Sequence, residues 1–150
     1  MASDRRRSLL ARLLLLVGAL AVLATGADHL EEYAFNQFST VPTIGTLFLL
    51  NFIAASVLGM GLLLAACRPG GSRDVLRTLL ALGGIGLAGS SLVALWISEH
   101  SVLFGFKDYG YRPAIVAAIV AEAVAVVALS GYLALAHRRL PESGAQPLVQ

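Results

Sequence analysis

Two polar side chains stand inside apolar runs that are long enough to cross a lipid bilayer. Glu122 lies nine residues after Pro113, and Asn51 lies nine residues after Pro42. At about 1.5 Å per helical residue, both fall about 13 Å along their helices, near the middle of a hydrocarbon core about 30 Å thick. An ionised carboxylate at that depth is costly, so we expect Glu122 to be protonated, partnered or both. The spacing predicts a hydrogen bond between Asn51 and Glu122 or, as the alternative, a proton or cation site.

A second candidate site consists of two histidines that each follow an acidic residue. His29 follows Asp28, and His100 follows Glu99, close to the end of an apolar run in both cases. Imidazole and carboxylate groups together could hold a divalent metal, and two equivalent histidines could ligate a haem. Each ring could instead bind the last carbonyls of its helix, where the helix dipole favours positive charge. The spacing is less specific than a CxxC or HExxH motif, so we predict no cofactor and keep the metal and the haem as alternatives.

The sequence offers no nucleophile with a base at a suitable spacing. Ser90, Ser91 and Ser98 are expected on a helix face without a nearby base that spacing alone can supply. Cys67 is the single cysteine and has no partner for a disulfide within the chain. We therefore assign no catalytic residue, and the sequence favours a protein that is not an enzyme.

The elements that must position these groups are four apolar segments. Of the 150 residues 57% are hydrophobic and 13% are charged, and the mean hydropathy is +0.79, which together indicate a membrane protein. A helix needs about 20 apolar residues to span the hydrocarbon. Such runs cover Leu9–Ala27, Pro42–Ala66, Val75–Ile97 and Pro113–Ala136. The sequence thus predicts an all-α integral membrane protein with a bundle of four transmembrane helices.

The stretch that follows the first span recurs 71 residues later, from Asp28 to Glu99, without a gap. Equivalent positions keep their chemical type, which predicts two tandem, parallel helical hairpins related by an axis along the membrane normal. We expect one membrane domain over 1–150, with hairpins over about 9–66 and 75–136 and an unordered tail over about 140–150. The matching pairs are Asp28 with Glu99, His29 with His100, Tyr33 with Phe104, Phe35 with Phe106, Phe38 with Tyr109, Pro42 with Pro113 and Asn51 with Glu122.

The loop charges predict the orientation of the bundle. Nine of the eleven basic residues flank the ends of the spans on one side, and only Lys107 and Arg112 lie on the other. Basic residues stay in the cytoplasm, so we expect both termini there and both hairpin loops outside. We also expect the first eight residues to form a basic, unordered lead. The richness in Ala, Leu and Arg is typical of high-GC bacterial genomes, so the sequence favours the inner (plasma) membrane of a bacterium.

Two further sets of residues could mediate packing. Phe35, Phe38, Phe106 and Tyr109 recur in the two hairpin loops, where their rings could cover the mouth of the bundle or bind an apolar ligand. Small residues four apart on the third span, Gly86, Ser90 and Ala94, predict a face on which another helix packs closely.

These observations favour a small four-pass membrane protein that acts as a scaffold or as an accessory subunit of a membrane assembly. Its expected partners are the lipid bilayer and another membrane protein or a second copy of the chain. Nucleic acid is not expected, because the basic residues are explained by membrane topology. The alternatives are a small transporter coupled to protons or cations through Glu122, and a metal- or haem-binding redox protein that uses His29 and His100.

Overall fold

The computed structural model describes residues 2–68, 74–105, 107, 110 and 112–137. Four long helices account for most of these residues: α1 (Ala2–Ala34), α2 (Ile44–Cys67), α3 (Val75–His100) and α4 (Pro113–His137). One turn of 3-10 helix, η1 (Phe38–Thr40), lies between α1 and α2. The described part of the chain contains no β-sheet, so the all-α prediction is confirmed. The tail expected over 140–150 lies outside the described residues.

All four helices contain a segment with the length and hydropathy of a membrane span. These segments are Ser3–Ala34, Ile44–Cys67, Val75–His100 and Pro113–Ala136. The protein is therefore a small multi-pass membrane protein. We call the end of the bundle that carries residues 35–43, 101–105 and 112 the hairpin end.

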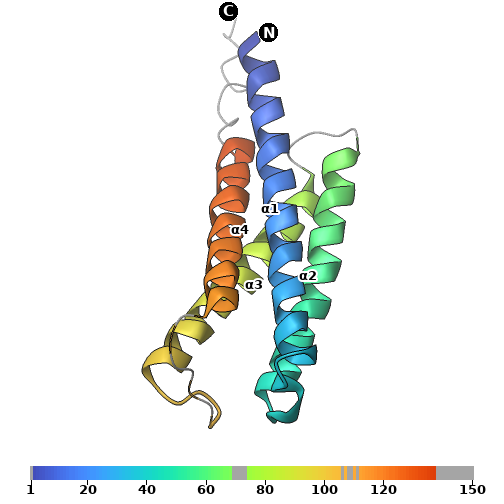
Figure 1. The fold of residues 1–150 in the computed structure, drawn as a ribbon. Helices are drawn as coiled ribbons and strands as arrows, with labels where there is room; N and C mark the ends of the chain where they lie inside the picture. Colours follow the sequence, from blue (N-terminus) through green and yellow to red (C-terminus); the bar gives the residue numbers. More distant parts are fainter. Residues whose placement is uncertain (1, 69–73, 106, 108–109, 111, 138–150) are drawn as a thin grey trace, which may run out of the picture.

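The helices form a ring in which each contacts the next along the chain, and α4 closes the ring on α1. α1 lies in front of α3, with α2 and α4 on either side (Figure 1). Within the described residues α1 contacts all three other helices, whereas α2 and α4 do not contact each other. This order is compatible with two hairpins side by side, and their origin from one duplicated unit stays a prediction.

Small side chains allow the helices to approach closely. One fully buried alanine comes from each helix, namely Ala19, Ala55, Ala81 and Ala125. In a bilayer the hydrophobic effect does not drive helices together, so close backbone approach and dispersion contacts carry much of the association. Larger side chains such as Leu129 and Tyr132 fill the spaces between the alanines.

Both boundaries of α1 and the start of α2 differ from the predicted ones. α1 begins at Ala2, so the basic lead is helical and not unordered, and α1 continues through the polar stretch after Ala27 to Ala34. α2 begins at Ile44, two residues after Pro42, because Thr43 takes a left-handed backbone angle (φ 68°) just before the helix. α3 begins as expected, since the Asp74 carboxylate accepts a hydrogen bond of 3.0 Å from the Leu76 N–H.

Candidate functional site

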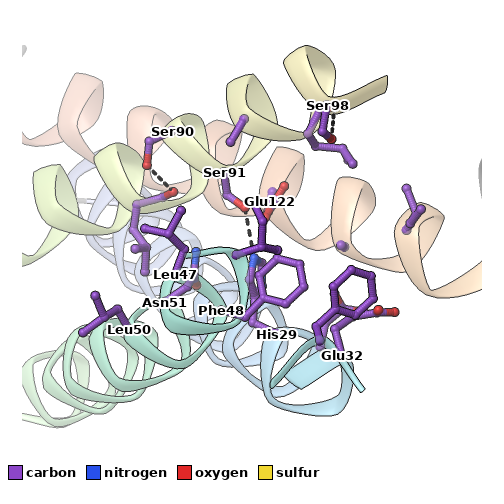
Figure 2. Close-up of a pocket in the computed structure, with 18 of the residues that line it drawn as sticks. His29, Glu32, Leu47, Phe48, Leu50, Asn51, Ser90, Ser91, Ser98 and Glu122 are labelled. Atoms are coloured by element: carbon purple, nitrogen blue, oxygen red, sulfur yellow. Dashed lines mark hydrogen bonds between the residues drawn. The ribbon is translucent and has the colours of Figure 1, made fainter. Parts of the chain in front are cut away.

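A cavity of about 450 Å³ lies within the bundle toward the hairpin end. Its walls come from the C-terminal parts of α1 and α3, the N-terminal parts of α2 and α4, and η1. Of the 21 described lining side chains twelve are apolar and nine are polar or charged, and several of the polar ones are labelled in Figure 2. This size and composition match those of sites that bind small molecules.

Glu122 is the most deeply buried ionisable group of this cavity. The side chain is 1% exposed and lines the cavity from α4. Neither carboxyl oxygen has a hydrogen-bond partner among the described residues. The Ser91 hydroxyl on α3 is the polar side-chain group next to this carboxyl group, but it does not meet the geometry of a hydrogen bond to either oxygen. The carboxyl group therefore has unused hydrogen-bonding capacity that a ligand or a proton could use.

His29 joins α1 to α3 beside Glu122. Its ring is buried, with Nδ1 2.8 Å from the Thr25 carbonyl oxygen and Nε2 3.2 Å from the Ser91 hydroxyl oxygen. A carbonyl oxygen only accepts, so Nδ1 carries a proton and donates it to Thr25. A neutral ring then accepts the Ser91 O–H at Nε2. Both ring nitrogens are satisfied, and Figure 2 shows His29 and Glu122 on the two sides of Ser91.

Asn51 reaches the same cavity from α2 but does not pair with Glu122. The Asn51 Oδ1 atom is buried and has no hydrogen-bond partner among the described residues. The predicted hydrogen bond between the two side chains is absent because α2 and α4 occupy opposite corners of the ring. The two residues thus share a cavity, and the neighbour of Glu122 is Ser91 instead.

An ion pair lies at the rim of the cavity near the hairpin end. The Arg112 guanidinium is 3.5 Å from Glu32 Oε2, and the Asn36 amide donates a 3.2 Å hydrogen bond to Glu32 Oε1. The Arg112 guanidinium also lies 5.8 Å from the centre of the Phe38 ring. Asp28 is the remaining acidic residue of the lining.

His100 has a different environment from His29, its partner in the sequence repeat. The His100 ring is exposed and stacks on Trp96 with 4.8 Å between ring centres, and its Nδ1 lies 2.8 Å from the Trp96 carbonyl oxygen. His100 does not line the cavity, and Glu99 does not line it either. Among the described residues no group of three or more His, Cys, Asp or Glu side chains is arranged to hold a metal. The structure does not bring Asp28, His29, Glu99 and His100 together.

The predicted loop aromatics are divided between the surface and the cavity. Phe38 is buried, lines the cavity and packs against Phe48, with 5.1 Å between ring centres. Phe35 is 80% exposed. Phe106 and Tyr109 lie outside the described residues.

The small residues of α3 face two directions. A Cβ atom added at Gly84 would lie 2.7 Å from Leu129 Cδ1, so this glycine allows α3 to approach α4 closely. Gly86 has nothing within 4 Å of its Cβ position, whereas Ser90 and Ala94 line the cavity. Among the described residues no other helix packs closely against the predicted face over Gly86, Ser90 and Ala94.

The sequence-based reasoning missed three contributors to the site: Ser91, Phe48 and the Glu32–Arg112 ion pair. Ser91 is seven residues before Ser98, a spacing that places both serines on one face of a helix. This shared polar face is the signal in the sequence that points to Ser91. Phe48 is one helical turn before Asn51, so the polar residue could have pointed to its aromatic neighbour. The ion pair joins α1 to the residue before α4, and no local pattern predicts such a contact.

A comparison with protein families, curated proteins and solved structures found no match for this chain. The function is therefore inferred from the geometry and chemistry of the cavity.

Proposed function

We propose that this chain binds a small molecule in its intramembrane cavity, with Glu122 as the group that meets a proton or a cation there. Such a site suits a small transporter that is coupled to protons or cations through Glu122. The observation that carries it is a fully buried carboxyl group whose two oxygens lack hydrogen-bond partners among the described residues and which lines a cavity of about 450 Å³. Ionisable groups within the membrane are expensive and mark ligand or proton sites.

A neutral fluorescent probe tests this proposal. N-phenyl-1-naphthylamine brightens in apolar surroundings, and we expect saturable binding at one site per chain of the detergent-purified protein. Ala94→Phe should abolish this binding, because Ala94 lines the cavity and a benzyl group would fill part of it. The matched control is Ala123→Phe, at an exposed position of α4 that does not line the cavity. Equal saturable binding by both variants would refute the proposal.

A scaffold or accessory role is the second candidate, and the outward face of α3 favours it. No atom lies within 4 Å of the Cβ positions at Gly86 and Gly89, and the neighbouring Leu82 and Val93 are exposed. Such a face suits packing against another membrane helix or a second copy of the chain. If the chain self-associates through this face, Gly86→Leu should reduce the mass of the detergent-solubilised particle measured by light scattering.

We also propose that the protein resides in a bacterial inner membrane with both termini in the cytoplasm. The support is the distribution of charge, because the ends of the helices opposite the hairpin end carry most of the arginines. The cavity would then lie in the outer half of the bilayer.

A further inference from the structure

The ionisable groups around the cavity point to a positively charged ligand. Among the described residues three carboxyl groups line the cavity, those of Asp28, Glu32 and Glu122, together with one guanidinium, that of Arg112. Arg112 lies at the rim, where it pairs with Glu32. The hydrogen bonds of His29 suit a neutral ring. In the described part of the chain, the deep part of the cavity therefore holds a carboxyl group, that of Glu122, with no cationic side chain beside it.

An aromatic wall stands near this carboxyl group. The Phe48 and His29 rings are nearly perpendicular with 5.2 Å between centres, and the Phe38 ring lies 5.1 Å from the Phe48 ring. Figure 2 shows Phe48, His29 and Glu122 in the same part of the cavity. The faces of aromatic rings attract cations, most strongly where water is excluded. A carboxylate beside aromatic rings is thus suited to an organic cation.

An inorganic ion fits this cavity less well. Calcium requires about six to eight oxygen ligands, and transition metals require several nitrogen, sulfur or oxygen donors. The described residues contain no group of three or more His, Cys, Asp or Glu side chains that could hold a metal ion. The apolar lining instead provides contact area for hydrocarbon groups.

Exposed lining residues of the cavity lie on α2 and α3. Of the neighbouring helix pairs in the ring, this pair makes the sparsest contact. Three lining residues lie there at the molecular surface, namely Leu47, Leu50 and Ser90, and the Leu50 side chain is 55% exposed. Exposed faces of membrane-spanning helices meet the bilayer, so a ligand can enter from the hydrocarbon without crossing the hairpin end.

We infer that the ligand is a membrane-soluble organic monocation that enters between α2 and α3 and replaces the proton of Glu122. This inference rests on the proposed function and specifies its ligand class. Binding converts the carboxylic acid into a carboxylate paired with the cation, and one proton leaves to the solution for each cation bound. The charged and polar groups that share the cavity with Glu122 are Asp28, His29 and Glu32 on α1, Asn51 on α2, Ser90, Ser91 and Ser98 on α3, and Arg112 before α4.

Tetraphenylphosphonium is a suitable probe, and tetraphenylborate is its control of similar shape and opposite charge. Calorimetry on the full-length protein in detergent should show one phosphonium site per chain, with an affinity that rises with pH while Glu122 is protonated. We expect Glu122→Gln to weaken this binding by about 30-fold or more, equivalent to about 2 kcal/mol. Glu31→Gln makes the same chemical change at an exposed residue outside the cavity and should bind as wild type does.

Proton release provides a readout that needs no variant. In weakly buffered solution, wild-type protein should release about one proton per phosphonium bound, as measured with a pH-sensitive dye. The inference is wrong if no proton is released, if tetraphenylborate binds equally well, or if Glu122→Gln protein of native helicity binds with wild-type affinity. If phosphonium fails to displace N-phenyl-1-naphthylamine from its saturable site, the ligand class is wrong and the proposed function stands. If neither probe binds in the cavity, both proposals fail.

Discussion

Glu122 and His29 show how individual side chains in a membrane protein acquire their roles from their neighbours. Glu122 is buried without a hydrogen-bond partner among the described residues, which costs free energy and serves no evident packing purpose. His29 is buried with both ring nitrogens hydrogen-bonded, which stabilises the contact between α1 and α3. Glu122 is therefore suited to ligand binding, and His29 is suited to holding Ser91 beside the cavity.

The two histidines of the sequence repeat should differ in their contribution to stability. His29→Ala removes one buried and one partly buried hydrogen bond and leaves Ser91 without its partner on α1, so we expect a loss of about 1–3 kcal/mol in the free energy of unfolding. His100→Ala removes an exposed ring and should change this free energy by less than about 0.5 kcal/mol. Unfolding by titration with sodium dodecyl sulfate, followed by circular dichroism, measures both. Equal losses for the two variants would contradict the difference in burial.

At the scale of the helix, α3 has two glycine-containing faces with different surroundings. Gly84 faces α4, and Leu129 Cδ1 occupies the space into which its Cβ atom would project. Gly86 faces outward, away from the other helices of the chain. Both glycines lie in the same run of sequence, so only their position around the helix axis distinguishes their roles.

Alanine substitutions at Gly84 and Gly86 should have different effects on the stability of the protein. Gly84→Ala places a methyl group 2.7 Å from Leu129 Cδ1, and Leu129 is itself fully buried, so we expect a destabilisation of about 1–3 kcal/mol. Gly86→Ala meets no atom within 4 Å and should leave stability unchanged or raise it by up to about 1 kcal/mol, because alanine favours the helix. Thermal unfolding of the two variants in one detergent provides the comparison. A larger loss for Gly86→Ala would indicate that its face packs against a second chain.

At the scale of the whole molecule, the bundle has a charged end and a hairpin end. The charged end carries most of the arginines, and the exposed Cys67 lies at this end of α2. The hairpin end carries the rim ion pair and the exposed Phe35. The proposed orientation places these two ends in different compartments, which makes them distinguishable by chemical labelling.

A membrane-impermeant maleimide should react with Cys67 in inverted membrane vesicles and not in intact cells. Phe35→Cys in a Cys67→Ser background should show the opposite pattern, because Phe35 is 80% exposed at the hairpin end. The readout is the shift in gel mobility of the labelled protein. Labelling of Cys67 in intact cells would reverse the assigned topology.

The sequence by itself determined the class of protein, the number of its long helices and the approximate extent of three of them. Hydropathy predicts a span wherever about 20 apolar residues follow one another, and this signal is local, so α2, α3 and α4 were predicted closely. The start of α1 was missed because no local signal separates a helical basic segment from an unordered one. Glu122 and Asn51 were identified as candidates because a polar group in an apolar run is conspicuous without any knowledge of its neighbours.

Only the tertiary structure decided which of these groups meet. The repeat relates His29 to His100, yet one ring lies in the cavity and the other lies on the surface. Asn51 and Glu122 share a cavity without touching, because the rotation and separation of helices depend on the packing of small side chains such as Gly84 and Ala55. These contacts join residues far apart in the chain, and the depth of a residue in the membrane does not specify the side of the helix on which it lies.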